Sequence, residues 1–138
     1  MALSAGFAPR RIGQVPHVGS FAYKVRAATK IFEGGMVGVD AAGNLVPVNT
    51  AAALAVAFVG MASRTYDNSA NGSASPDKVE AMKGTYQITV PAATSANINA
   101  AVYATDDNTF TLTASTNLQV GTIAGFDGAQ TYVKLLGS

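Results

Sequence analysis

Residues that could carry out acid–base, nucleophilic or metal chemistry are scarce in this chain of 138 residues. There is no Cys, which excludes disulfide bonds, thiolate nucleophiles and Cys-ligated zinc. The single His, His17, lies among Pro and Gly residues, whereas a catalytic triad needs an ordered His beside a Ser and an acid. We therefore predict that the protein is not an enzyme, because no acid–base or nucleophile–base pair can be assembled.

Two short motifs could supply oxygen ligands or a modification site. Asp106, Asp107 and Asn108 could hold Ca²⁺, but acids and Asn between two strands are also typical of a hairpin turn, which we favour. The sequence Asn-Gly-Ser at positions 71–73 matches the N-glycosylation pattern, which we interpret as a chance match in a loop. Neither common glycine-rich phosphate motif occurs. We expect no metal and no cofactor.

The charges are divided unevenly along the sequence. Residues 1–32 carry +5 and no acid, whereas residues 33–138 carry −4, giving the formal net charge of +1. Such asymmetry favours an acidic partner for the basic segment. Direct nucleic-acid binding is not expected, because the rest of the chain would repel phosphates and no basic-aromatic face is visible.

No segment of the sequence targets or spans a membrane. The longest apolar run, residues 51–62, is too short to cross a bilayer. At the start of the chain the apolar stretch precedes the arginines, which is the reverse of a secretory signal. We expect no membrane partner and assembly in a reducing cytoplasm, which the absence of Cys also fits.

Alternation of apolar and polar residues with period two begins at Tyr23 and predicts a set of short strands. Residues 36–39 and 45–48 flank a five-residue hairpin turn, and Pro47 marks the second strand as an edge. Further strands are predicted at residues 58–66, 78–83, 85–90, 102–105, 109–113, 119–126 and 131–136. About eight to ten short strands predict an all-β fold, a small β-barrel or sandwich.

The segments between these strands give further predictions, and so do the strands themselves. Residues 68–76 contain no large apolar side chain and are expected to form a mobile surface loop. One helical turn is expected within residues 91–101, whereas residues 51–57 are rich enough in Ala for a short helix but lack the length and the capping box of one. Six apolar residues that alternate with polar ones are expected to face the core or an oligomer interface: Tyr86, Ile88, Phe110, Leu112, Val133 and Leu135.

The first 22 residues are predicted to form an extended N-terminal arm, followed by a β-rich domain at residues 23–138. Pro and Gly at short intervals exclude a helix or a central strand, yet apolar side chains recur along the arm. A solvated tail gains nothing from such side chains, so we expect the arm to lie on a surface, either that of its own domain or that of a neighbour. We favour the second, in which the arm extends from its own domain and lies on a neighbouring subunit, either capsid protein or another copy of this chain. The residues predicted to bind this partner are Phe7, Arg10, Arg11, Ile12, Val15, His17, Val18 and Phe21.

Three stretches of the sequence together resemble a known family. They are KIFEGGMVGVDAAGNLVP at 30–47, FVGMA and YDNSA at 58–62 and 66–70, and VYATDDNTFTLT, VGTIAGF and YVKL at 102–113, 120–126 and 132–135. Their order is similar to the capsid cement, or head-decoration, proteins of tailed bacteriophages. The resemblance implies a structural virion protein that binds the outside of an icosahedral capsid and stabilises neighbouring capsid subunits. The implied partners are the major capsid protein and further copies of the chain, most often as a homotrimer.

Other structural roles stay open on the sequence alone. A spike or tail-fibre component, or a glycan-binding adhesin module, would also be β-rich and rich in Thr, Asn and Gly. A glycan-binding module usually shows a cluster of exposed aromatic residues, and Trp is absent here. The location that the resemblance implies is the capsid exterior of a virion assembled in the cytoplasm of a bacterial host.

Overall fold

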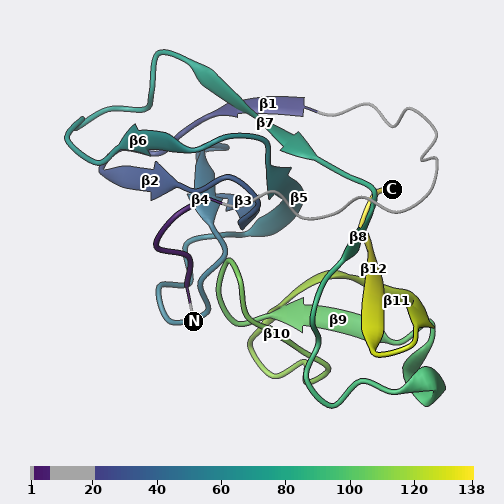
Figure 1. Ribbon diagram of the computed structural model, residues 1–138. Helices are drawn as coiled ribbons and strands as arrows, with labels where there is room; N and C mark the ends of the chain where they lie inside the picture. The colour runs from purple at the N-terminus through teal and green to yellow at the C-terminus, as the bar shows by residue number, and fades with distance from the viewer. Residues whose placement is uncertain (1, 7–20) are drawn as a thin grey trace.

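The computed structural model describes residues 2–6 and 21–138 (Figure 1). The described residues form twelve strands and one 3₁₀ turn, which confirms the predicted all-β class with more strands than expected. The strands are β1 (Phe21–Lys24), β2 (Thr29–Ile31), β3 (Met36–Val39), β4 (Leu45–Pro47), β5 (Ala57–Ala62), β6 (Tyr66–Asn68), β7 (Lys78–Met82), β8 (Thr85–Gln87), β9 (Ala101–Ala104), β10 (Phe110–Thr111), β11 (Leu118–Asp127) and β12 (Gln130–Leu135). The 3₁₀ turn, η1 (Ser95–Asn97), falls within the predicted helical segment.

The strands form two five-stranded sheets and one two-stranded sheet. The first large sheet has the order β1-β7-β5-β3-β4, the second has the order β10-β9-β11-β12-β8, and β2 pairs with β6. All these neighbours are antiparallel. The two large sheets lie at opposite ends of the molecule, toward the upper left and the lower right of Figure 1. The arrangement is sandwich-like and forms no closed barrel.

The core consists of two apolar clusters, one on each face of the first large sheet. The larger cluster joins Met36 and Met61 of that sheet to the second large sheet. The smaller cluster lies on the opposite face and includes Ile31 of β2 and Val37 of β3. Met36 and Val37 are neighbours on β3 and both are 1% exposed, so this strand is buried on both faces.

The predicted core residues lie where the alternation places them. Five of them are buried: Tyr86, Ile88, Phe110, Val133 and Leu135. Leu112 is half-buried and packs against the larger cluster. The period-two pattern therefore assigned the inner face of the second large sheet correctly.

The predicted hairpin between residues 36–39 and 45–48 is confirmed. Val37 pairs with Pro47, and β4 is the edge strand that Pro47 predicts. The carboxylate of Asp40 accepts hydrogen bonds from the backbone of Ala42 and Asn44, which holds the turn. The sequence signal is reliable here because every group involved lies within a few residues of its partner.

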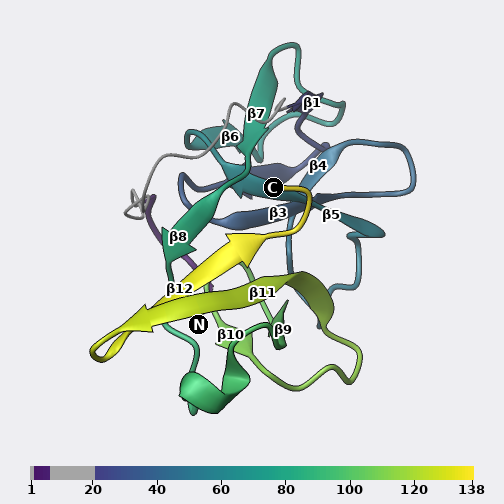
Figure 2. The ribbon, with the colours of Figure 1, turned by 90° about the vertical axis from the view of Figure 1, so that its right-hand side faces the viewer.

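The chain passes from the first large sheet to the second between β7 and β8 (Figure 2). Only Lys83 and Gly84 separate the two strands, and Gly84 has a φ of 127°, a conformation that favours Gly. The hydroxyl of Tyr86 donates to the carbonyl of Lys83 at 3.0 Å. A bend of this kind is how one continuous stretch of chain can serve both sheets of a sandwich.

Two segments differ from the sequence-based expectation in their secondary structure. Residues 58–66 do not form one strand, because the chain leaves the first large sheet after Ala62 and pairs with β2 from Tyr66 onward. Residues 51–57 form turns and extended chain, not the short helix that their Ala content alone would allow. In both cases the local composition allows the expected element, and contacts with distant strands decide otherwise.

Residues 68–76 form the expected surface loop, in which residues 69–73 and 76 are exposed, but two of its polar residues are buried. Asn68 is 4% exposed and Ser75 is fully buried. The side-chain nitrogen of Asn68 donates to the carbonyl oxygens of Val25, Arg26 and Ser73 at 3.2, 3.0 and 3.0 Å. These small polar side chains fasten the loop to the chain after β1, so their composition reflects hydrogen bonding within the fold.

The expectation that residues 1–22 extend away from their own domain is wrong at both ends of that segment. The backbone N–H of Leu3 donates to the carboxylate of Asp107 at 2.9 Å. At the other end, β1 begins at Phe21, which pairs with Ala81 of β7 in the same chain. The first strand therefore starts two residues before the predicted domain boundary, and the part between the two ends lies outside the described residues.

Candidate functional site

The residues that the sequence predicts to bind a partner are mostly beyond the part of the chain that the structure describes. Those outside it are Phe7, Arg10, Arg11, Ile12, Val15, His17 and Val18. Phe21 is described, and its side chain is 67% exposed although its backbone pairs with β7. An apolar ring at this level of exposure is compatible with a contact to another molecule.

A second exposed apolar feature lies between β4 and β5. Residues 51–57 are all apolar, and only Ala55 among them is not exposed. Leu54 is 40% exposed and Val56 is 65% exposed. No charged residue occurs between Asp40 and Arg64. We refer to residues 51–57 as the apolar lobe. A run of exposed apolar residues is unusual on a protein surface and is typical of a surface that contacts another molecule.

Hydrogen bonds explain why the apolar lobe is not a helix. The side-chain oxygen of Asn49 accepts from the backbone of Ala51 at 3.0 Å, as a capping residue does. Ala53 then adopts a φ of 51°, which ends any helical turn. The backbone N–H of Val56 donates to the carbonyl of Val39 at 2.8 Å, which returns the chain to the first large sheet.

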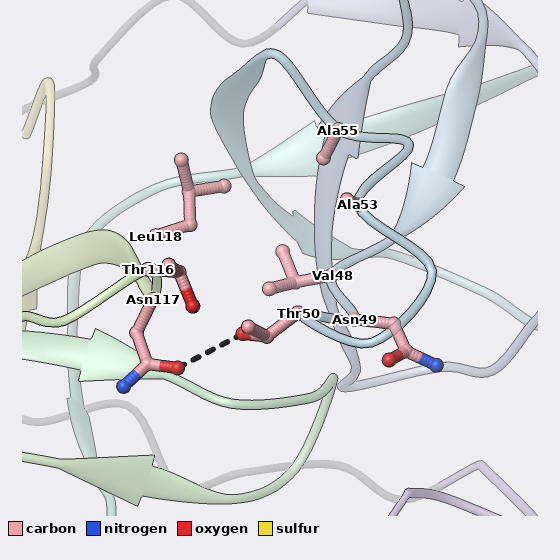
Figure 3. Close-up of a pocket in the computed structure, with 8 residues that line it drawn as sticks. All are labelled: Val48, Asn49, Thr50, Ala53, Ala55, Thr116, Asn117 and Leu118. Atoms are coloured by element: carbon pink, nitrogen blue, oxygen red, sulfur yellow. Dashed lines mark hydrogen bonds between the residues drawn. The ribbon is translucent and has the colours of Figure 1, made fainter.

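A hollow of about 160 Å³ lies beside the apolar lobe (Figure 3). It is lined by Val48, Asn49, Thr50, Ala53, Ala55, Thr116, Asn117 and Leu118. One wall thus follows β4, and the other leads into β11. The hydroxyl of Thr50 donates to the side-chain oxygen of Asn117 at 2.9 Å and joins the two walls. The nitrogen of the same Asn117 carboxamide donates to the carbonyl of Thr113, which fixes its orientation.

The lining of the hollow carries no formal charge. None of its lining residues is charged, so no proton donor or acceptor with an ordinary acid–base role faces it. Beyond the lining, the chain between Lys83 and Lys134 carries Asp106, Asp107 and Asp127 and no basic residue. The backbone N–H of Thr50 donates to the carbonyl of Thr105, which brings the wall next to the acidic turn after β9. The surroundings of the hollow therefore favour a neutral or cationic partner.

Asp107 is the buried carboxylate of that turn, and it has a structural role. Its side chain is 4% exposed, and burial raises the pKa of Asp107 above the ordinary value of 3.8. The hydrogen bond from the backbone of Leu3 acts in the opposite direction and does not cancel the effect of burial. Asp107 holds the start of the chain through its hydrogen bond from Leu3. Among residues 2–6 and 21–138, no group of three His, Cys, Asp or Glu side chains could hold a metal ion.

The sequence contains a signal for the apolar lobe that the strand pattern does not include. Residues 51–57 are apolar without the period of a strand or of an amphipathic helix, and they lie in the long uncharged stretch before Arg64. The hollow has no such signal, because Thr50 and Asn117 are 67 positions apart. Within the described chain, no helix is long and apolar enough to cross a membrane.

Comparison of the chain with protein-family models, with curated proteins and with solved structures finds no match.

Proposed function

We propose that this chain is a structural virion protein that binds the exterior of an icosahedral phage capsid and cements neighbouring capsid subunits. The observation that supports this most directly is the apolar lobe, whose Leu54 and Val56 are exposed beside a hollow without charge. A protein that only has to hold other subunits needs a rigid body and an apolar contact surface, and needs no reactive group. Burial of such a surface against a partner is the main source of protein–protein affinity.

The proposed partners are the major capsid protein and further copies of this chain, most often three around an axis. A capsid offers many equivalent positions, so modest single contacts become collectively strong when copies also hold one another. The proposed location is the capsid exterior of a virion that assembles in the bacterial cytoplasm. The basic residues of the N-terminal segment would add charge contacts, which weaken as the salt concentration rises.

The lining of the hollow favours a protein partner over a glycan. None of the eight lining residues is aromatic, and small-molecule sites are commonly lined by apolar and aromatic side chains with a few placed polar groups. The amide of Asn117 is already engaged by Thr50 and Thr113. A protein side chain of moderate size, which needs no new hydrogen bonds, suits this lining better than a sugar ring.

Co-sedimentation with phage heads that lack this protein tests the proposal. The full chain is expected to pellet with the heads. Val56→Asp is expected to weaken binding by about ten- to hundredfold, because it removes an apolar contact and places a charge in the interface. Ile98→Asp is the matched control, since Ile98 is 44% exposed next to η1 and outside the apolar lobe.

Two results would contradict different parts of the proposal. If the full chain does not pellet with heads under any salt concentration, the cementing function is wrong. If it pellets and the variants Val56→Asp and Ile98→Asp bind equally well, the function stands and the apolar lobe is not the contact surface. Thermal melting of each variant checks that the β fold is retained.

A further inference from the structure

The segment at residues 7–20 is attached to the domain at both of its ends. Before it, the backbone of Leu3 is bonded to Asp107, and a side chain at Gly6 would touch Thr65 and Glu33. After it, Phe21 enters β1 and pairs with β7. A chain spans at most about 3.3–3.6 Å per residue, so the middle of this segment can reach roughly 24 Å from its attachments. This distance is enough to reach a neighbouring molecule.

The middle of the segment combines positive charge with apolar side chains. Arg10 and Arg11 precede Ile12, and Val15 follows after Gly13 and Gln14. There is no acid anywhere in residues 7–20. Ile12 and Val15 flank the midpoint and are therefore among the side chains that can reach farthest from the two attachments.

The hollow matches these side chains in size and in charge. Its volume of about 160 Å³ is close to that of an apolar cavity of about 150 Å³ that accepts benzene, so it has room for one Ile or Val side chain. Its lining is uncharged, and the sheet beyond it, between Lys83 and Lys134, carries only acidic charges. A segment with two adjacent Arg residues and no acid is complementary to these surroundings.

We propose that the middle of residues 7–20 of one copy docks into the hollow between residues 48–55 and 116–118 of a neighbouring copy. Ile12 or Val15 occupies the hollow, and Arg10 and Arg11 face the acidic end of the neighbour. The contact is heterologous, because a segment of one copy meets a different surface of the next. If the rotation between successive copies closes, repetition of this contact around an axis gives a small cyclic oligomer. This inference deepens the proposed function and rests on it only for the biological setting.

Sedimentation equilibrium of the protein alone tests this docking without any capsid. A variant with residues 7–20 replaced by a Gly/Ser linker of equal length keeps both attachments and is expected to be monomeric. Thr116→Arg places a positive charge at the rim of the hollow, and we expect it to weaken self-association by about tenfold or more. Thr89→Arg is the control with the same change of charge at an exposed position outside the hollow. Thr116→Glu is expected to leave association intact or tighten it.

A mixing experiment separates docking on a neighbour from docking within one copy. The linker variant keeps an intact hollow, and Thr116→Arg keeps an intact segment, so their mixture can form one productive contact per pair. We expect the mixture to form a heterodimer at concentrations where each variant alone is monomeric. Absence of the heterodimer would overturn docking between copies.

Two other results would also overturn the inference. One is that the full chain is monomeric at every concentration tested. The other is that the variants Thr116→Arg and Thr89→Arg self-associate equally strongly. Circular dichroism of each variant confirms that the sheets are formed. Failure here leaves the head-binding experiment unaffected, because the capsid contact is measured separately with Val56→Asp.

Discussion

The backbone N–H of Leu3 and the carboxylate of Asp107 are joined by a hydrogen bond of 2.9 Å across 104 positions of the sequence. The bond ties the start of the chain to the turn between β9 and β10. Together with the pairing of Phe21 with Ala81, it makes residues 7–20 a connection with two fixed ends. Deletion of residues 1–22 would therefore remove Leu3 and part of β1 as well as the segment between them, so the linker replacement is the cleaner experiment.

Replacement of Asp107 by Asn should change how stability depends on pH. Burial raises the pKa of Asp107 above 3.8, so the native state binds its proton more tightly than the unfolded chain does. The contribution of Asp107 to the free energy of unfolding therefore decreases as pH rises from 3.8 through the raised value. Asn keeps an acceptor for Leu3 without the charge. Asp107→Asn is expected to melt at a higher temperature than the parent at neutral pH and to lose this advantage in mild acid.

The control for this prediction is Asp127→Asn, which removes the same charge from the exposed end of β11. Melting temperatures of the three proteins are compared at neutral pH and in mild acid. An equal gain in both variants at neutral pH would show that net charge, and not the burial of Asp107, is responsible.

Removal of the Asn68 side chain should lower the free energy of unfolding more than removal of an exposed loop side chain does. Asn68→Ala deletes four side-chain hydrogen bonds, the three that Asn68 donates and the one that it accepts from Asn71. The carbonyl of Val25 keeps the bond from the backbone N–H of Ser75. Each lost hydrogen bond costs about 0.5–1.5 kcal/mol, so we expect a loss of about 2–4 kcal/mol in the free energy of unfolding. Urea denaturation measures it.

The exposed Asn108 provides the matched control for Asn68. Asn108→Ala lies in the turn after β9 and is expected to change the free energy of unfolding by about 0.5 kcal/mol or less. Similar losses for the two substitutions would mean that the carboxamide of Asn68 does not hold the loop.

Two adjacent leucines at the end of the chain test the assignment of the core. Leu135 is 1% exposed in the larger cluster, whereas Leu136 is among the exposed hydrophobic residues. Leu135→Ala is expected to cost about 2–5 kcal/mol in the free energy of unfolding, because it leaves a cavity. Leu136→Ala should cost about 1 kcal/mol or less. Equal costs in chemical denaturation would contradict the register of β12.

Two glycines of β11 differ in the space around them. A Cβ at Gly121 would lie 2.3 Å from the carbonyl oxygen of Lys134 on β12, whereas a Cβ at Gly125 would meet no atom within 4 Å. Gly121→Ala must push these paired strands apart and is expected to cost about 1–3 kcal/mol. Gly125→Ala should be nearly neutral in thermal melting. A neutral Gly121→Ala would refute the close approach of the two backbones.

The sequence by itself determined the all-β class, most of the strands and the residues that face the second sheet. These features depend on local information. The alternation in Tyr86 and Ile88 sets which side chains are buried, and the turn from Asp40 to Asn44 is closed by groups within it. Each of these signals is complete within one short stretch of chain.

The tertiary structure decided the features whose partners are far apart in the sequence. The polar composition of residues 68–76 predicts a loop, but only the fold brings Asn68 to Val25, 43 positions earlier. Likewise, the exposure of Val56 and the hollow between Thr50 and Asn117 depend on how β4, β5 and β11 pack. Composition reports what a residue can bond to, whereas packing of distant strands determines which partner is within reach, because hydrogen bonds and apolar contacts act only over a few ångströms.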